Sequence, residues 1–168
     1  STVIEVCGDR EDGDPIAFVR GPEVRELAFR ERGFEYRLDL GTTQKTGYYL
    51  DQRDNRAHVE RLASGRAVLD AFSYVGAFSL AAARGGAEKV VALDSSASAL
   101  AAAASHVRAH GYDSKVELRK ADVKRALTEI AQTKERFDLV IIDPPKLVPT
   151  ARHLEAGRAA YRRLNANA

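Results

Sequence analysis

From Arg66 onward the sequence alternates short apolar runs with segments of helical spacing, and this order limits the possible folds more than any other feature. Parallel strands need crossover connections of about a dozen residues, usually helices, and such crossovers are right-handed. The pattern therefore predicts an α/β domain on a parallel sheet. The predicted strands are 67–71, 89–93, 116–118 and 137–142. The predicted helices are 78–83, an Ala-rich helix that ends at His110, 123–131 and 151–165. Either Ser95 or Ser96 is expected to cap the start of the Ala-rich helix.

The first part of the chain has a different, β-type pattern. Val3–Cys7 is a short β-branched run, and Val24–Arg30 and Phe34–Leu40 alternate apolar and charged residues on either side of a turn. Such alternation predicts a hairpin with one buried face. A small antiparallel β-rich unit is therefore expected before the main domain. The expected domain limits are 1–43 and 44–168, the second opening with a polar-aromatic loop and a modest helix over 53–63.

The last predicted strand, Phe137–Ile142, is almost wholly apolar, which is typical of a strand covered on both faces and paired along both edges. Only one more helix follows it, so further sheet strands are expected beyond Ala168. The chain also begins with Ser1 and contains no methionine. Together these features favour a piece of a longer protein, truncated before the last strands of its sheet.

Composition argues against some classes of protein. No stretch approaches the roughly 18–20 apolar residues that a membrane-spanning helix needs, and the first residues lack the layout of a secretory signal. A single cysteine, Cys7, cannot form an internal disulfide, which indicates a reducing, cytoplasmic setting. No membrane partner is predicted, and nothing in the sequence indicates an oligomeric state.

Charge gives a weaker indication. The net charge of +2 is too small to indicate nucleic-acid binding by itself. Residues 144–168, however, contain five basic side chains and one acidic side chain, which gives +4. A basic patch of this kind could contact phosphates, and a solvated helix face explains it equally well.

The turn after the first parallel strand is the first candidate site. Ligands of parallel α/β sheets bind beyond the carboxyl ends of the strands. Asp70 lies at such an end, and Gly76 would let a ligand approach the backbone of the turn. One glycine does not meet the three-glycine dinucleotide pattern. An ordinary strand–helix turn is therefore an equally good interpretation of this segment taken alone.

Two further aspartates follow the next strands. Asp94 ends the second strand, 24 residues after Asp70, and an acidic residue at about this spacing accepts hydrogen bonds from ribose hydroxyls. It could instead be a favourable acid at a helix N-terminus. By the same reasoning Asp122 would accept from the exocyclic amine of an adenine. Its alternative role is the N-cap of the helix that follows, and both roles can hold.

The segment Asp143-Pro144-Pro145-Lys146 follows the apolar strand directly and is the strongest local signal. Two prolines fix the backbone angles and remove two N–H donors. They would hold Asp143 rigidly at the carboxyl edge of the sheet, where a substrate and a cofactor would meet. A chance loop of this composition is the less common alternative.

Three segments, taken together and in this order, resemble a known family. They are Lys45–Arg56 (KTGYYLDQRDNR), Val68–Gly76 (VLDAFSYVG) and Phe137–Lys146 (FDLVIIDPPK). The combination resembles the bacterial 23S rRNA (cytosine-C5) methyltransferase family, whose members depend on S-adenosylmethionine. The resemblance extends from about Val24 to Asn165, and linked motifs are more specific than any one of them. It implies a Rossmann-like class I methyltransferase sheet preceded by a small β-rich unit.

The resemblance also implies roles for individual residues. The flipped base of 23S rRNA would enter beside Asp143 and Pro144, where an aspartate can hydrogen-bond the edge of a cytosine. The expected cofactor-binding residues are Tyr49, Gln52 and Arg53 in a segment folded over S-adenosylmethionine, Asp70, Ser73, Tyr74 and Gly76 at its methionine part, Asp94 with Ser95 at its ribose, Asp122 at its adenine, and Asp143 in the pocket.

The implied chemistry needs a nucleophile. Carbon 5 of cytosine is a poor nucleophile, so enzymes of this family attack carbon 6 with a cysteine thiolate. The resulting enamine takes the methyl group, a base removes the carbon-5 proton, and the bond between the cysteine sulfur and carbon 6 breaks to release the thiolate. The family's cysteine lies on a later strand and is therefore expected beyond residue 168. Cys7 lies far along the sequence from Asp143 and is interpreted as a packing residue.

Other functions stay open at this point. Guanine-N7 methylation of rRNA, by relatives with similar motifs, would need no cysteine. A nucleotide-binding oxidoreductase is disfavoured by the single glycine of the turn and by the Asp143-Pro144-Pro145 segment. A non-catalytic methyltransferase-like domain that binds RNA is the third alternative.

Some positions depart from the family pattern. The family tends to carry asparagines where this chain has Ser105, His106 and His110, and its turn is richer in glycine than Val75–Ala77. These differences bear on the affinity for the cofactor. The histidines show no metal-ligand spacing, so no metal site is predicted.

Overall fold

The computed structural model describes residues 3–6, 16–20, 24–40, 48–145 and 154–166. They fall into two compact units, Ser1–Arg53 and Asp54–Ala168. The expected domain limits of 1–43 and 44–168 stay a prediction. Within the described ranges, no helix has the length and apolar character that crossing a membrane requires.

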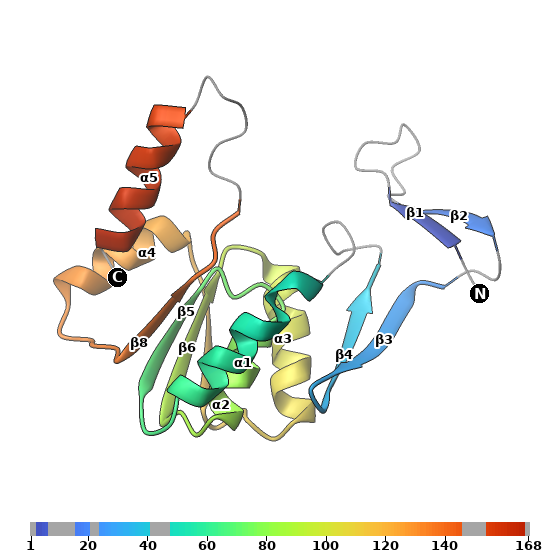
Figure 1. Cartoon of the computed structure of the whole chain (residues 1–168), viewed down its shortest axis with the longest axis horizontal. Helices are drawn as coiled ribbons and strands as arrows, with labels where there is room; N and C mark the ends of the chain where they lie inside the picture. Colours follow the sequence, from blue (N-terminus) through green and yellow to red (C-terminus); the bar gives the residue numbers. More distant parts are fainter. Residues whose placement is uncertain (1–2, 7–15, 21–23, 41–47, 146–153, 167–168) are drawn as a thin grey trace. The chain divides into compact units, whose positions relative to one another are not determined.

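The first unit contains two antiparallel strand pairs (Figure 1). Strands β1 (Val3–Val6) and β2 (Ile16–Arg20) form one pair, and β3 (Glu26–Glu31) and β4 (Phe34–Asp39) form the other. The second pair is the predicted hairpin, and the prediction is confirmed. The strand β2 was not predicted from the sequence. Cys7, interpreted as a packing residue, lies outside the described residues.

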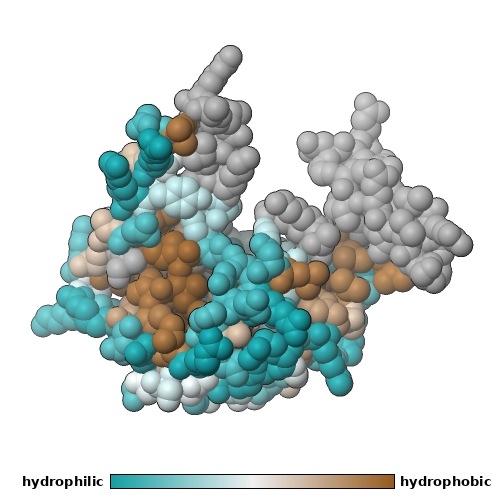
Figure 2. Space-filling model, viewed as in Figure 1, coloured by the Kyte–Doolittle hydropathy of each residue, from teal (hydrophilic) through white to brown (hydrophobic). Residues whose placement is uncertain are grey.

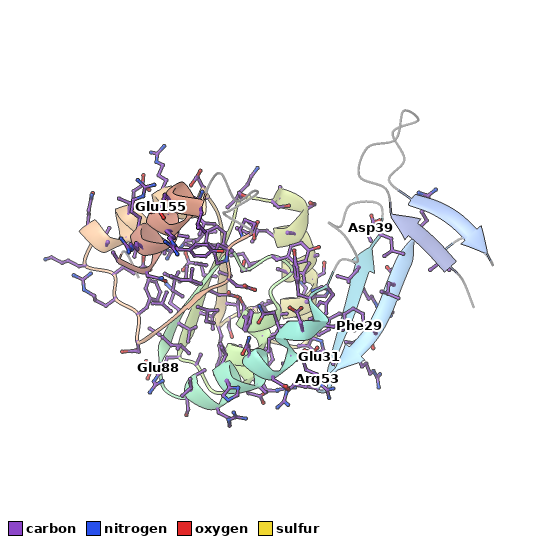
Figure 3. The ribbon with its side chains drawn as sticks, turned by 45° about the horizontal axis from the view of Figure 1, so that its top comes forward. Phe29, Glu31, Asp39, Arg53, Glu88 and Glu155 are labelled. Atoms are coloured by element: carbon purple, nitrogen blue, oxygen red, sulfur yellow. The ribbon has the colours of Figure 1, made fainter. Side chains whose placement is uncertain are left out.

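The hairpin owes its turn to Arg32 and Gly33, whose φ values of 50° and 88° are both positive. A two-residue turn of this kind matches the right-handed twist of the flanking strands. Phe29 and Glu31 project from β3 (Figure 3). Tyr36, on β4, stacks on Phe29 with ring centroids 5.3 Å apart. Alternate residues of the hairpin therefore form its apolar face.

The second unit is built on a parallel sheet with the strand order β7-β6-β5-β8. The chain enters the sheet in the middle at β5, moves outward through β6 to β7, and returns to the other side of β5 with β8. The order therefore reverses beside β5, the kind of place where α/β sheets bind ligands. The strands are β5 (Ala67–Ala71), β6 (Lys89–Asp94), β7 (Val116–Lys120) and β8 (Leu139–Ile142).

Helices cover both faces of this sheet (Figure 1), as expected for crossovers between parallel strands. α2 packs against β6 and α3 against β7 on one face, and α4 and α5 pack against the opposite face. The helices of this unit are α1 (Arg53–Leu62, which begins at the boundary), α2 (Ala77–Arg84), α3 (Ala97–Ala109), α4 (Val123–Gln132) and α5 (Leu154–Ala166).

Side chains of the central strands alternate between the two faces, because successive residues of a strand point to opposite sides. Leu69 of β5 and Leu93 of β6 pack with Leu127 of α4 and Leu164 of α5 in one buried cluster. Asp70 lies between two members of that cluster, Leu69 and Ala71, and so points to the other face, toward α2. Because side chains alternate along β5, the Asp70 carboxyl lies in the layer between the sheet and α2.

The structure corrects the prediction for β8. The strand begins at Leu139 rather than at Phe137, and among the described residues it pairs along one edge only, with β5. Its side chains at Leu139, Val140 and Ile142 are half-buried, and Figure 2 shows apolar surface where β5 and β8 lie. The apolar composition fits coverage of one face by α4 and α5 and pairing with β5. Pairing along the second edge stays a prediction, because its partner strand is expected beyond Ala168.

Candidate functional site

The turn between β5 and α2 has an unusual backbone. Phe72 and Tyr74 have φ values of 68° and 50°, and Gly76 has a φ of 79°. Positive φ is costly for residues with a Cβ, so surrounding contacts must hold the turn. The Ser73 amide donates to the Leu93 carbonyl at the end of β6, and the Gly76 amide donates to the Ser73 carbonyl, each at 2.9 Å. The predicted site residues Ser73, Tyr74 and Gly76 therefore lie at the carboxyl edge of the sheet.

Asp94 is tied to the same turn. Its Oδ2 accepts a hydrogen bond from the Tyr74 amide, and its Oδ1 accepts one from the Ser96 amide, each at 2.8 Å. A carboxylate has about four lone-pair sites, so each oxygen keeps capacity for one more donor. The two backbone donors orient the carboxylate, and the remaining capacity is what two ribose hydroxyls would use.

Asp70 is 1% exposed, and its Oδ2 accepts a 2.6 Å hydrogen bond from the buried Ser79 Oγ. Burial raises the pKa of Asp70 to about 7, the Ser79 hydrogen bonds oppose the rise, and the negative charges of Asp143 and Asp94 add to it. Near neutral pH the carboxyl of Asp70, which lies beneath the turn, is therefore partly protonated and partly ionised. Sequence reasoning did not single out Ser79; its place three residues into the helix after the turn was the available signal.

Asp143 follows β8 directly. Its amide lies 3.5 Å from the carbonyl of Ala71, at the end of β5, so the aspartate stands beside the strand that carries Asp70. Asp143 and Pro144 are half-buried, and Lys146 lies outside the described residues. The structure thus brings Asp70, Asp94 and Asp143 to one edge of the sheet, as the topology predicts.

Asp122 has the capping role that the sequence left open. Its Oδ1 accepts a hydrogen bond from the Arg125 amide at 3.0 Å, and its side chain is exposed at the start of α4. Contact with an adenine stays a prediction. The capping residue of α3 is Ser96, whose Oγ accepts from the Ala99 amide at 3.2 Å. Ser95 is exposed, and its role at the ribose also stays a prediction.

Three predicted residues belong to the other compact unit. Tyr49 precedes the short 3₁₀ helix η1 (Leu50–Gln52) and is 43% exposed, Gln52 is half-buried, and Arg53 is exposed. Since these residues are part of the unit Ser1–Arg53, their place over a cofactor stays a prediction.

The side chain of Ser73, in the same turn, bears on ligand binding. The hydroxyl of Ser73 is buried, and among the described residues it has no hydrogen-bond partner. A buried unsatisfied hydroxyl is costly and uncommon, so a bound polar group is a natural partner for it. No group of three or more metal-ligating side chains is found within the described ranges.

Comparisons with known proteins agree with this geometry. A family model described as S-adenosylmethionine-dependent methyltransferase matches residues 10–166. The chain is 40% identical over 140 residues to Ribosomal RNA large subunit methyltransferase I from Erwinia tasmaniensis, covering 83% of this chain and 35% of that protein. It is 37% identical over 158 residues to a protein of the same name from Alteromonas mediterranea, covering 93% and 40%. The chain therefore spans less than half the length of these relatives.

Solved structures give the same picture. A candidate S-adenosylmethionine-dependent methyltransferase from Streptococcus mutans superposes with a TM-score of 0.72 at 30% identity, covering 85% of this chain and 40% of that one. A candidate methyltransferase in complex with S-adenosylhomocysteine (SAH) gives a TM-score of 0.72 at 32% identity, covering 80% and 36%. These likenesses confirm the predicted Rossmann-like α/β fold class.

Proposed function

The chain belongs to the S-adenosylmethionine-dependent methyltransferase family, and we propose that it forms the cofactor-binding part of an enzyme that methylates large-subunit ribosomal RNA. The observation that carries the proposal is the Asp94 carboxylate, held by the amides of Tyr74 and Ser96 with capacity left for two hydroxyl donors. The substrate class rests on the names of the relatives.

The residues at the sheet edge fit the cofactor. Asp94 would accept from the ribose hydroxyls, and the Ser73 hydroxyl, buried and without a partner in the described part, would bond the methionine part. Asp70 would face the amino group, whose positive charge favours an ionised carboxylate. When bound, S-adenosylmethionine supplies an electrophilic methyl group carried on a sulfonium sulfur.

We assign the target base as cytosine and the methylated atom as carbon 5 in 23S rRNA. Asp143 and Pro144 would line the pocket for the flipped base, with the Asp143 carboxylate bonding the amino edge of the cytosine. The attacking cysteine is expected beyond residue 168. The resemblance to the cytosine-C5 family supports this finer assignment. The alternative reaction is guanine-N7 methylation, which relatives with similar motifs perform. The alternative to an enzyme is a domain that binds RNA without catalysing a reaction. Family membership disfavours the oxidoreductase interpretation.

Cofactor binding is tested by thermal denaturation of this chain. SAH at about 100 times its Kd should stabilise the chain by about 2.7 kcal/mol, a rise in Tm of about 5–10 °C for a chain of this size. Asp94→Asn should lose most of this rise, because an amide cannot accept from both backbone donors. Asp113→Asn, an equal charge change at an exposed turn, should keep it. Stabilisation by NAD and not by SAH would overturn the proposal.

The target atom is tested with a protein that contains this chain and spans the full length of the relatives that the chain matches. Tritiated S-adenosylmethionine and protein-free 23S rRNA should give labelled 5-methylcytidine after digestion to nucleosides. RNA containing 5-fluorocytidine should form a covalent adduct with the protein, because fluorine at carbon 5 blocks the final proton removal. Labelled 7-methylguanosine without an adduct would support the alternative. SAH and RNA binding without any labelled nucleoside would support the non-catalytic domain.

A further inference from the structure

A buried histidine on α3 contacts the cofactor turn from the side. His106 is 3% exposed, and its Nδ1 lies 3.0 Å from the carbonyl oxygen of Val75. The two residues are 31 positions apart, so packing of α3 beside the turn brings them together. No role in the proposed function has been assigned to His106.

The direction of this hydrogen bond follows from the chemistry of its partners. A carbonyl oxygen can only accept, so Nδ1 of His106 carries the proton and donates. The neutral imidazole must then be the Nδ1–H tautomer, and a protonated imidazole would donate from the same atom. The bond to Val75 is therefore available in both charge states of the ring.

The bond holds a particular peptide plane. The carbonyl of Val75 and the amide of Gly76 belong to one planar peptide unit. His106 donates to that carbonyl, and the amide donates to the Ser73 carbonyl at 2.9 Å. The peptide unit is thus held from both sides, which fixes its rotation. Gly76 follows in the left-handed region with a φ of 79°, and α2 begins one residue later.

A second contact sets the distance between α3 and the turn. A Cβ added to Gly76 would lie 3.0 Å from the Cβ of Ala103, and Ala103 lies one helical turn before His106, on the same face of α3. Ala103 therefore limits how closely the helix approaches Gly76, while His106 determines how the peptide before Gly76 is oriented.

We propose that His106 is a positioning residue, which holds the Val75–Gly76 peptide in the orientation that binding of the cofactor's methionine part requires. The inference rests on the proposed function, because it takes the Ser73–Gly76 turn as part of the cofactor site.

Two substitutions of His106 separate its hydrogen bond from its volume. The side-chain amide nitrogen of asparagine is the same number of bonds from Cβ as Nδ1 of histidine. His106→Asn can therefore replace the donor, and His106→Leu removes it at similar volume.

The test compares SAH affinity with stability in this chain. By calorimetry, His106→Leu should raise the Kd for SAH at least tenfold, and His106→Asn should stay within about threefold of the original chain. Val107→Ala is the matched control, since Val107 is the next residue of α3 and is 3% exposed. It should lower the urea midpoint and leave the Kd unchanged. Unchanged SAH affinity in His106→Leu, or an equal loss in Val107→Ala, would overturn the proposal.

A second readout separates this inference from the proposed function. Amide hydrogen exchange at Gly76 needs no ligand, and His106→Leu should accelerate it at least tenfold more than it accelerates exchange in the β6 strand. His106→Asn should restore protection. If the original chain binds no SAH, the cofactor proposal fails while the exchange result still decides whether His106 holds the turn. Unchanged Gly76 exchange in His106→Leu would show that it does not.

Discussion

The hydroxyl of Ser79 donates a 2.6 Å hydrogen bond to Oδ2 of Asp70, and both side chains are buried between β5 and α2. The bond satisfies the Ser79 hydroxyl and one carboxyl oxygen, yet it does not offset the desolvation of Asp70. The pKa of Asp70 is raised to about 7. This carboxyl therefore titrates in the range where most enzymes work, and stability and ligand binding should both depend on its charge.

The substitution Asp70→Asn should stabilise the chain at pH 8 and have little effect at pH 4. The pKa is raised on folding from 3.8 to about 7, so the folded state retains the proton that the unfolded state releases between these values. Ionisation of Asp70 therefore costs folding stability as pH rises from about 4 to 7. A shift of one pKa unit corresponds to about 1.4 kcal/mol, and we expect a gain of about 2–4 kcal/mol at pH 8 in urea unfolding. An equal effect at pH 4 would contradict this account.

Binding of SAH should release a proton at pH 6. If the ligand's ammonium group lies near Asp70, as proposed, its charge lowers the pKa of the carboxyl, and the proton held below pH 7 leaves. Calorimetry in two buffers of different ionisation enthalpy should show close to one proton released at pH 6 and almost none at pH 8.5. The Asp70→Asn chain should release none at either pH. Equal proton release by both chains would show that the proton comes from a group other than Asp70.

The arrangement of the parallel sheet was predictable because its signals are local. The runs at β5 and β6 are apolar and bounded by turn residues, and crossover handedness then sets the topology. The gathering of Asp70, Asp94 and Asp143 at one edge follows from that topology alone, since carboxyl ends of parallel strands lie together. β2 was not predicted, because Ile16–Arg20 is a short, nearly continuous apolar run, and the period of such a run does not distinguish a strand from a buried helical segment.

Contacts between distant elements were not predictable in the same way. The bond from His106 to Val75 depends on how α3 packs beside the turn, and no spacing in the sequence encodes it. The same holds for Ser79, which becomes a partner of Asp70 only because α2 lies over β5. For Asp122 the sequence supported both a cap and an adenine contact, and the structure establishes the cap.

Replacing Arg119 by methionine should destabilise the chain at neutral pH more than in acid. Arg119 forms a two-pronged ion pair with Glu135, at 2.8 and 2.9 Å, and bonds Glu117 at 2.6 Å. The Arg119 and Lys89 side chains lower the pKa of Glu117 from 4.5 to about 2. The contribution of Glu117 is thus present above about pH 4.5 and is lost as pH falls toward 2.

The expected loss for Arg119→Met is small, because the Glu117 side chain is 44% exposed and solvent screens the pair. We expect about 1 kcal/mol at pH 7, and less than half of that at pH 3 or in 1 M NaCl, from urea unfolding. Arg125→Met, which removes an exposed pair with Glu129 on α4, is the matched control and should cost less at every pH. A loss for Arg119→Met that is the same at pH 7 and pH 3 would show that packing of the arginine, and not its charge, matters.

The packing of Gly85 against the backbone of α1 predicts a severe effect for Gly85→Ala. Gly85 has an ordinary helical φ of −67°, so alanine would be acceptable to its backbone. A Cβ there, however, would lie 2.0 Å from the carbonyl oxygen of Glu60 on α1. The Arg84 guanidinium holds the Glu60 carboxylate at 2.7 and 2.9 Å, so α1 cannot move away without disturbing this pair. We expect a loss of about 2–3 kcal/mol in urea unfolding.

Gly65→Ala is the control: its Cβ meets nothing within 4 Å, and its φ of +66° alone should cost about 1–2 kcal/mol. If Gly85→Ala proved no more destabilising than Gly65→Ala, α1 would have to shift freely over α2, and the Glu60–Arg84 pair would not be holding the two helices together.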